Sequence, residues 1–135
     1  MHGEILSEQF PSIGTVTNPA VNYDEINLLL CYKIAPISGG GVAILEFRDI
    51  FDFRINPLNV EGLGDSKYPV NAWSFTEVTG ADKNYKWSAL NPRFWTVSFN
   101  DMTIEILFAS VKKVMETRDY TSPSIALKKF IVSTL

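Results

Sequence analysis

The chain has 135 residues, of which 46% are hydrophobic and 20% are charged, a composition typical of a folded globular domain and unlike that of a disordered chain. We therefore expect residues 1–135 to form a single domain around one core. Twelve Lys and Arg against fifteen Asp and Glu give a formal net charge of -3. No bulk positive field is available to hold a phosphate backbone, which argues against a nucleic-acid partner.

Cysteine content and hydropathy indicate the cellular compartment that we expect for the protein. The single cysteine, Cys31, lies in an apolar run and has no partner for an internal disulfide, so we expect a buried thiol. The N-terminus lacks the basic and then apolar pattern of a secretory signal. No apolar stretch approaches the roughly 20 residues that a membrane-spanning helix needs. These features favour a cytoplasmic protein without a membrane partner.

The first 56 residues are dominated by strand patterns. Residues 1–24 mix Pro, Gly and Asn with short apolar pieces and predict an irregular lead-in with room for a short strand. Alternating apolar residues from Ile26 to Ile34 predict a central strand. Pro36 and the glycines at 39–41 end it, and residues 42–47 resume extended character, so we expect a hairpin. Alternation continues to residue 56 but breaks at Asp49 and Ile50, which predicts a bend or bulge there.

The middle of the chain is predicted as a loop, a strand and a helical turn. Residues 57–67 carry the Asn, Gly, Asp and Ser of a loop, and residues 68–78 predict a return to a strand. Residues 80–90 leave room for one helical turn with Asp82 as its cap, closed by Asn91 and Pro92.

Residues 94–108 predict a β-hairpin with a two-residue turn at Asn100 and Asp101. With that turn, every facing pair matches in polarity, and a one-residue slip would mix the two faces. We expect the apolar face to lie on the core, so that Val97→Asp largely unfolds the domain and Thr96→Asp does far less. The apolar pairs are Phe99 with Met102, Val97 with Ile104 and Trp95 with Ile106, and the polar pairs are Ser98 with Thr103 and Thr96 with Glu105.

The C-terminal part ends in a predicted helix. Residues 111–120 are compatible with a continuing strand or with a loop. Ser122 followed by Pro123 is typical of a helix start, and an apolar stripe follows it at Leu127, Phe130, Ile131 and Leu135. The sequence therefore predicts an α+β fold, mainly antiparallel β-sheet with a short C-terminal helix. It leaves open whether the sheet is strongly curved or barrel-like.

Candidate catalytic groups are few. His2 is the only histidine, so neither an imidazole-assisted nucleophile nor a zinc site of the usual kind can be assembled. Residues 38–41 lack the lysine and the helix that follow a phosphate-binding loop and are better interpreted as a hairpin turn. Carboxylates and arginines alternate on residues 46–54 as on a solvated strand face. We expect no catalytic residues, no metal and no cofactor.

Aromatic residues make up 13% of the chain, and many lie between residues 68 and 95. Trp87 falls in a connection, where a tryptophan either closes the end of a core or waits for a ligand. Glu61 and Asp65 lie on the preceding loop, and Glu77 and Asp82 are close to Trp87 in sequence. If these loops meet at one end of the sheet, the five residues form an acidic, aromatic-rimmed surface suited to a basic protein partner.

Several spaced pieces between residues 45 and 108 resemble small bacterial domains of uncharacterised families, some of which look like immunity proteins of polymorphic toxin systems. The resemblance implies a cytoplasmic, metal-free binding protein and names no partner. The pieces are Phe53, Arg54, Pro57, Leu58, Asn59, Glu61, Leu63 and Gly64, then Trp73, Phe75 and Glu77, and finally Phe99, Asp101, Thr103 and Glu105.

Two functional hypotheses follow. The first is a non-catalytic protein-binding module, such as an immunity protein that neutralises a toxin. The alternative is a small-molecule-binding, β-barrel-like domain with or without weak carboxylate-based activity. An apolar pocket lined by Trp73 and Trp87 would favour the alternative, whereas a filled core with an exposed acidic rim would favour the first hypothesis.

Overall fold

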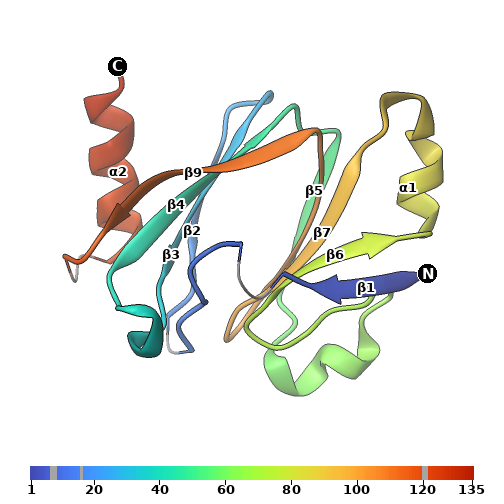
Figure 1. The fold of residues 1–135 in the computed structure, drawn as a ribbon, viewed down its shortest axis with the longest axis horizontal. Coiled ribbons are helices and arrows are strands. Elements are labelled where there is room, and N and C mark those ends of the chain that lie inside the picture. Colours follow the sequence, from blue (N-terminus) through green and yellow to red (C-terminus); the bar gives the residue numbers. More distant parts are fainter. Residues whose placement is uncertain (7–8, 16, 120–121) are drawn as a thin grey trace.

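The computed structural model describes residues 1–6, 9–15, 17–119 and 122–135 and contains two antiparallel β-sheets that face each other (Figure 1). The α+β class with mainly antiparallel sheet is confirmed, and among the described strands the sheets do not close into a barrel. The five-stranded sheet has the order β1 (His2–Ile5), β6 (Phe75–Thr79), β7 (Arg93–Ser98), β8 (Thr103–Phe108), β5 (Asp52–Asn56). The four-stranded sheet has the order β2 (Ala20–Tyr23), β3 (Leu28–Lys33), β4 (Val42–Arg48), β9 (Ser110–Thr117).

Both predicted hairpins are confirmed, and so is the register predicted for residues 94–108. Strands β7 and β8 pair with Trp95 opposite Ile106 and Val97 opposite Ile104. The Phe99 N–H donates to the Met102 carbonyl over 2.8 Å and closes the turn. Strands β3 and β4 form the earlier hairpin, joined by the short 3₁₀ helix η1 (Pro36–Ser38). The first 24 residues contain β1 and β2. Of the ambiguous residues 111–120, those up to Thr117 belong to strand β9, residues 118 and 119 follow it outside the strand, and residue 120 lies outside the described residues.

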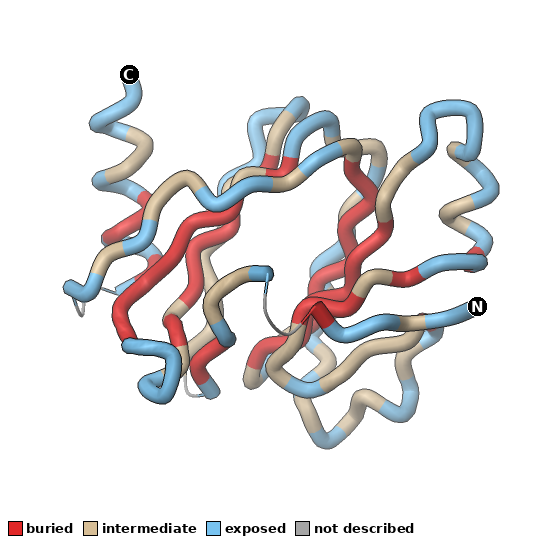
Figure 2. Tube along the Cα trace, viewed as in Figure 1, coloured by how far each residue is buried: buried red, intermediate tan, exposed pale blue. Residues whose placement is uncertain are grey.

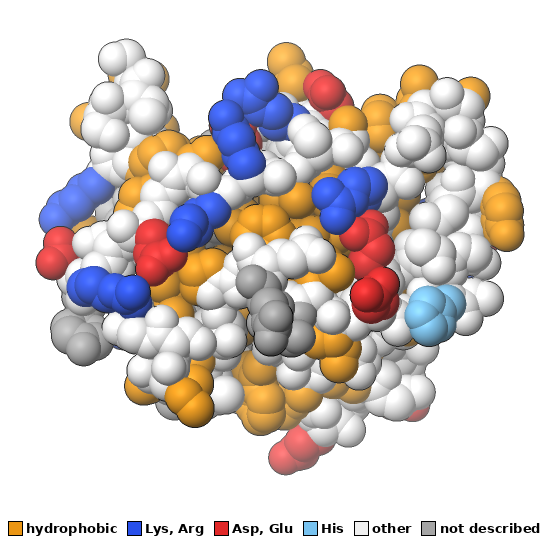
Figure 3. Space-filling view, viewed as in Figure 1, with side chains coloured by type: hydrophobic (Ala, Val, Ile, Leu, Met, Phe, Trp, Pro, Cys, Tyr) orange, Lys and Arg blue, Asp and Glu red, His pale blue; other side chains and the backbone are white. Residues whose placement is uncertain are grey.

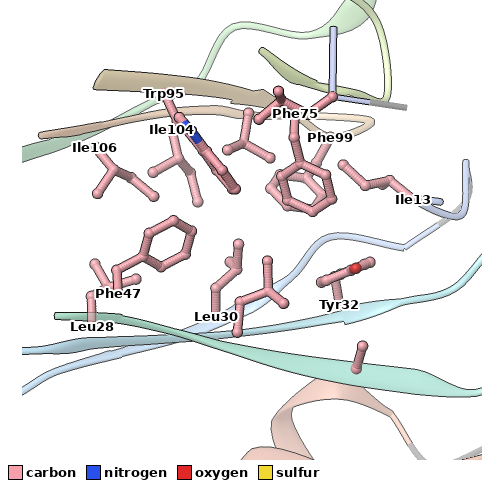
Figure 4. Packing of buried hydrophobic residues seen from close by; sticks show 14 of the residues in the cluster. Ile13, Leu28, Leu30, Tyr32, Phe47, Phe75, Trp95, Phe99, Ile104 and Ile106 are labelled. Carbon is pink, nitrogen blue, oxygen red and sulfur yellow. The ribbon is translucent and has the colours of Figure 1, made fainter. Parts of the chain in front are cut away.

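The main core fills the space between the two sheets. Leu30 and Phe47 of the four-stranded sheet point toward Trp95 and Ile104 of the five-stranded sheet, and none of the four is exposed to solvent (Figure 4). The Trp95 ring meets the Phe47 ring nearly edge to face, with 5.4 Å between centroids. Buried residues accordingly concentrate in the central strands of both sheets (Figure 2). Aromatic side chains packed in this way account for much of the unusual aromatic content.

The outer face of the four-stranded sheet is apolar and is covered by helix α2 (Pro123–Ser133). The helix starts as predicted, because the Ser122 hydroxyl accepts a hydrogen bond from the Ile125 N–H over 3.4 Å. Leu127 packs on Ile44 and on Cys31, which is fully buried as predicted. Burial raises the pKa of the Cys31 thiol to about 12.

The apolar stripe of α2 is shorter than predicted. Leu127 is buried and Phe130 and Ile131 are half-buried, but Leu135 is 98% exposed and was wrongly included. The helix ends at Ser133 after running past the sheet, as the protruding C-terminus shows (Figure 1).

The outer face of the five-stranded sheet is buried under residues 57–74 and the region of helix α1 (Asp82–Lys86). It is apolar near α1, where Val78, Phe94 and Leu107 form a buried cluster, and polar where residues 57–74 cover it. Thr96, where an Asp substitution was expected to do far less harm than at Val97, is only 1% exposed, and its hydroxyl donates to the Pro69 carbonyl over 2.6 Å. The covering chain includes the 3₁₀ helix η2 (Val60–Asp65). The buried polar residues of the chain's described part all lie on this face: Thr76, Thr96, Ser98, Thr103 and Glu105.

Two local predictions in this region need correction. The strand expected over residues 68–78 begins only at Phe75, because proline at 69 and a left-handed backbone at Trp73 (φ 49°) interrupt extended pairing. The helical turn within residues 80–90 is present as α1, followed by the 3₁₀ helix η3 (Ser88–Leu90), but Asp82 is its first residue and not its cap. Ala81 occupies the cap position, and its N–H donates to the Asn84 side chain over 2.9 Å.

Two strand pairs run from one sheet into the other at a shared corner. The chain passes from β4 to β5 and from β8 to β9, and the predicted bend is confirmed at Asp49, whose φ is 57°. The Ala109 N–H donates to the Arg48 carbonyl over 3.0 Å, and the Phe51 N–H donates to the Leu107 carbonyl over 2.8 Å. Hydrogen bonding between the two chain segments therefore continues through the corner. None of the helices in the described residues is long and apolar enough to cross a membrane.

Candidate functional site

A charged cleft of about 320 Å³ opens where residues 57–67 arch over the outer face of strands β5 and β8. Its floor is made by Arg54 and Asn56 of β5 and by Glu105 of β8, which share that face because side chains alternate along a strand. The chain leaves β5 at Pro57 and returns over the sheet after η2. The rim consists of Pro57, Leu58, Asp65, Ser66 and Lys67.

Glu105 is the most buried charged group of the cleft. It is 9% exposed, and the Asn56 side-chain amide donates to Glu105 Oε2 over 3.1 Å. Lys83 Nζ lies 3.7 Å from Glu105 Oε1 and donates instead to Asp52 Oδ2 over 2.9 Å. Burial opposes the charge of Lys83, but the hydrogen bond to Asp52 and the neighbouring carboxylates outweigh it, so the pKa of Lys83 is raised.

The rim is tied to helix α1 through Lys67 and Tyr68. Lys67 Nζ forms an ion pair with Asp82 Oδ2 at 3.0 Å, and the Tyr68 hydroxyl donates to Asp82 Oδ1 over 2.8 Å. The Tyr68 hydrogen bond, followed by that from Lys67, lowers the pKa of Asp82 to about 2. The Asp82 carboxylate is thus committed to internal contacts.

Three of the five residues predicted for the acidic surface lie together. Asp65 stands on the cleft rim, and Asp82 reaches that rim through Lys67. Glu61 lies one 3₁₀ turn before Asp65 in η2, whose first turn is capped by the Asn59 side chain accepting from the Gly62 N–H over 3.0 Å. Glu61 and Asp65 are exposed and form no ion pair with any described residue.

Glu77 does not join them, because it lies on the opposite face of the five-stranded sheet. Its carboxylate accepts from Trp95 Nε1 over 3.0 Å and from Arg93 Nη2 over 2.6 Å. The neighbouring residue Val78 packs on the outer side with Phe94, and alternation therefore points Glu77 toward the inner side. Glu77 is therefore close to Asp82 in sequence but does not lie on the same face of the sheet.

Trp87 lies at the C-terminal end of α1 and closes a small outer cluster. It is half-buried, and its ring stacks on Phe51 with 6.0 Å between centroids and an interplanar angle of 19°. Lys86 Nζ lies 5.8 Å from the Trp87 ring centroid. The exposed neighbours Tyr85 and Leu90 extend the apolar surface beside it.

Sequence reasoning placed Arg54 on a solvated strand face and gave Asn56, Lys67 and Glu105 no binding role. The missed indication was the length of the connection between residues 57 and 74, since a segment of that length must cross a face of the sheet before pairing again.

Charge is distributed unequally between the two sheets. Residues 2–5 and 52–108, which build the five-stranded sheet and its cover, carry eight acidic and five basic side chains. Residues 9–51 and 109–135 carry six acidic and seven basic ones. Figure 3 shows basic side chains gathered along β9 on one face of the molecule, with acidic ones over β1 and β6 near the only histidine. The acidic set of the first group is Glu4, Asp52, Glu61, Asp65, Glu77, Asp82, Asp101 and Glu105.

Trp73 and Trp87 pack on different clusters, Trp73 on the core between the sheets and Trp87 on the outer cluster. Trp73 lines a small cavity of about 100 Å³ with Phe10 and Phe75, and Trp87 packs on the other side of the sheet. Among the residues that the structure describes, no three His, Cys, Asp or Glu side chains gather as metal ligands. The two tryptophans therefore do not line one shared pocket, as the small-molecule alternative required.

Comparison with known proteins adds no relative: neither a family model, nor a curated protein, nor a solved structure matches the chain.

Proposed function

We propose that the protein is a non-catalytic protein-binding module that meets a basic partner with the outer side of its five-stranded sheet. The supporting observation is the pair of exposed carboxylates on η2, Glu61 and Asp65, which lack ion-pair partners among the described residues and lie in the acidic part of the molecule. A filled core between the sheets leaves recognition to the surface.

The acidic surface and its apolar flank would contribute differently to binding. Carboxylates such as Glu61 mainly speed encounter with a basic partner and reject acidic ones, and salt screens that effect. Affinity requires side chains that become buried in the complex, and Trp87 with its exposed neighbours Tyr85 and Leu90 offers such an anchor. Trp87 is half-buried before binding, which reduces the conformational entropy lost when a partner covers it.

The resemblance of residues 45–108 to immunity proteins suggests the kind of partner. We include in the proposal that the basic partner is a toxin and that the encounter takes place in the cytoplasm. The proposed binding surface rests on the cleft geometry and not on this resemblance. A basic partner that is not a toxin would therefore be expected to use the same surface.

The test is to capture proteins from a lysate of the native host and to measure the affinity of the retained partner. The wild type is compared with the double variant Glu61→Lys, Asp65→Lys and with Trp87→Ala. A matched control, Glu4→Lys with Glu25→Lys, changes net charge equally at exposed positions outside the cleft. We expect a basic protein whose affinity falls about ten-fold or more in the first double variant and changes little in the control.

Two results would contradict the proposal. One is that no protein is retained by the wild type. The other is that both double variants weaken binding equally, which would mean that net charge alone governs association. Circular dichroism and melting temperature of each variant establish that the fold is intact.

A further inference from the structure

We infer that the cleft between η2 and strands β5 and β8 binds a small zwitterion of the α-amino-acid class. Its ammonium group lies against Glu105 and Asp65, and its carboxylate lies against Arg54. This site goes beyond the proposed protein partner, because its ligand is a free small molecule.

The first argument is the relation between Arg54 and Glu105. They are directly opposite each other on adjacent antiparallel strands and project from the same face. Such pairs have Cβ atoms about 5 Å apart, and opposite charges at these positions ordinarily interact. Here the two charged groups form no ion pair, although both line the cleft. The geometry holds a cation and an anion side by side with open space against them.

The second argument is the incomplete hydrogen bonding of Glu105. A buried carboxylate is costly unless donors satisfy its oxygens. Among the described residues, its one hydrogen bond is that from Asn56 to Oε2. Lys83 Nζ forms an ion pair with Oε1 at 3.7 Å but is too far away to donate a hydrogen bond to it. An ammonium group with three donors would complete the coordination of Oε1 and could also reach toward Asp65 on the rim.

The third argument is that Arg54, on the floor of the cleft, has no ion-pair partner among the described residues, whereas Lys67, the cation of the rim, has one. Lys67 is held by Asp82 at 3.0 Å. Arg54 is exposed and has no ion-pair partner in the described residues. Its guanidinium presents a planar fork that matches a carboxylate in a bidentate arrangement. The carboxylate of the bound amino acid therefore lies against the Arg54 guanidinium.

The volume and the remaining walls narrow the ligand class. A cavity of about 320 Å³ falls at the lower end of the range for small-molecule sites. Pro57 and Leu58 supply apolar surface on the rim, where an aliphatic side chain would rest. Two cations, Arg54 and Lys67, and two anions, Asp65 and Glu105, line the cleft. A guest that carries both charges fits such a lining best, since a singly charged molecule would also meet side chains of its own sign.

The experiment is an amide NMR titration of the isotope-labelled protein with L-leucine. Two matched probes each lack one charge: N-acetyl-L-leucine keeps the carboxylate, and L-leucinamide keeps the ammonium. We expect saturable shifts at the Arg54, Asn56 and Glu105 amides with leucine, and at least about ten-fold weaker binding of either analogue. Arg54→Gln and Glu105→Gln should each weaken leucine binding by at least about ten-fold, while Lys112→Gln on β9 should not.

Several outcomes would overturn the inference. The absence of saturable shifts up to the solubility limit of leucine is one, and equal binding of either singly charged analogue is another. Arg54 is an exposed residue of an edge strand, so its variant keeps the inference testable even if Glu105→Gln unfolds the domain. If the Glu61→Lys variant no longer captures a protein partner but still binds leucine, the amino-acid site is distinct from the proposed protein-binding surface.

Discussion

The outer faces of the two sheets are both covered, but by opposite means. Helix α2 covers the four-stranded sheet through apolar contacts such as Leu127 on Ile44. Irregular chain covers the five-stranded sheet, where its backbone supplies hydrogen-bond partners, as when Thr96 donates to the Pro69 carbonyl. A polar strand face can therefore be a buried face when the covering segment satisfies its hydroxyl groups. The charged cleft over strands β5 and β8 lies at the polar interface.

A charged substitution in the core between the two sheets should destabilise the protein more than a substitution in either cover. Val97→Asp places a carboxylate where the side chain has no solvent exposure, and we expect about 4 kcal/mol or more of destabilisation or failure to fold. Urea denaturation followed by tryptophan fluorescence measures it, with Val97→Ala as the control for loss of volume alone. A charged variant no less stable than the alanine variant would show that this side chain faces solvent.

Truncating the apolar cover should have the next largest effect. Leu127→Ala removes a side chain that is 5% exposed and should cost about 2 to 3 kcal/mol. Val132→Ala, on the same helix at 67% exposure, should change the free energy of unfolding by less than about 0.5 kcal/mol. Thermal denaturation of both variants tests the difference, and equal melting temperatures would mean that α2 does not pack through Leu127.

Disturbing the polar cover should cost less. Thr96→Val removes the hydroxyl that donates to Pro69 while nearly keeping the shape, and we expect about 1 to 2 kcal/mol of destabilisation. Thr79→Val, at an exposed position of β6, is the matched control and should be close to neutral. If the two valine variants have the same urea midpoint, the hydrogen bond between the sheet and its cover adds nothing to stability.

The smallest effect concerns the link between the rim and α1. The pKa of Asp82 is about 2 against an ordinary 3.8, so its contribution to stability is present above about pH 4 and is lost as the pH falls toward 2. Tyr68→Phe removes the main cause and should raise the pKa of Asp82 toward its ordinary value. Lys67→Met should raise it less. Carboxyl ¹³C NMR titration measures both shifts, and a pKa unchanged by Tyr68→Phe would contradict the assigned hydrogen bond.

The parts of the fold that sequence reasoning predicted share one property, namely local pairing. The hairpin around Asn100 and Asp101 could be predicted to the residue, because a short turn and the matching of facing side chains leave one register. The burial of Cys31 and the start of α2 at Ser122 likewise depend on nearby residues. Thr96 could not be recognised as buried, since the segment that covers it returns from elsewhere in the chain.

The candidate site was only partly predictable for the same reason. Glu61 and Asp65 were recognised because loop carboxylates are usually exposed. Glu77 was misplaced because its face depends on the register of β6 within the sheet, which its sequence neighbours do not reveal. Arg54 was assigned to a solvated strand face and Glu105 to the polar face of the hairpin, and the cleft that both line also depends on residues 57–67.

The shared corner between the sheets has a consequence for the order in which the molecule forms. Strand β4 pairs with β9 from Val42 opposite Thr117 to Arg48 opposite Ser110, so the corner closes a very long stretch of chain. Closing long loops is entropically costly, and domains rich in such contacts fold slowly, on the scale of about milliseconds to seconds. The β3–β4 and β7–β8 hairpins can form early on their own. The corner closes only after both hairpins have formed. Until then the core-facing sides of the two sheets are not packed against each other.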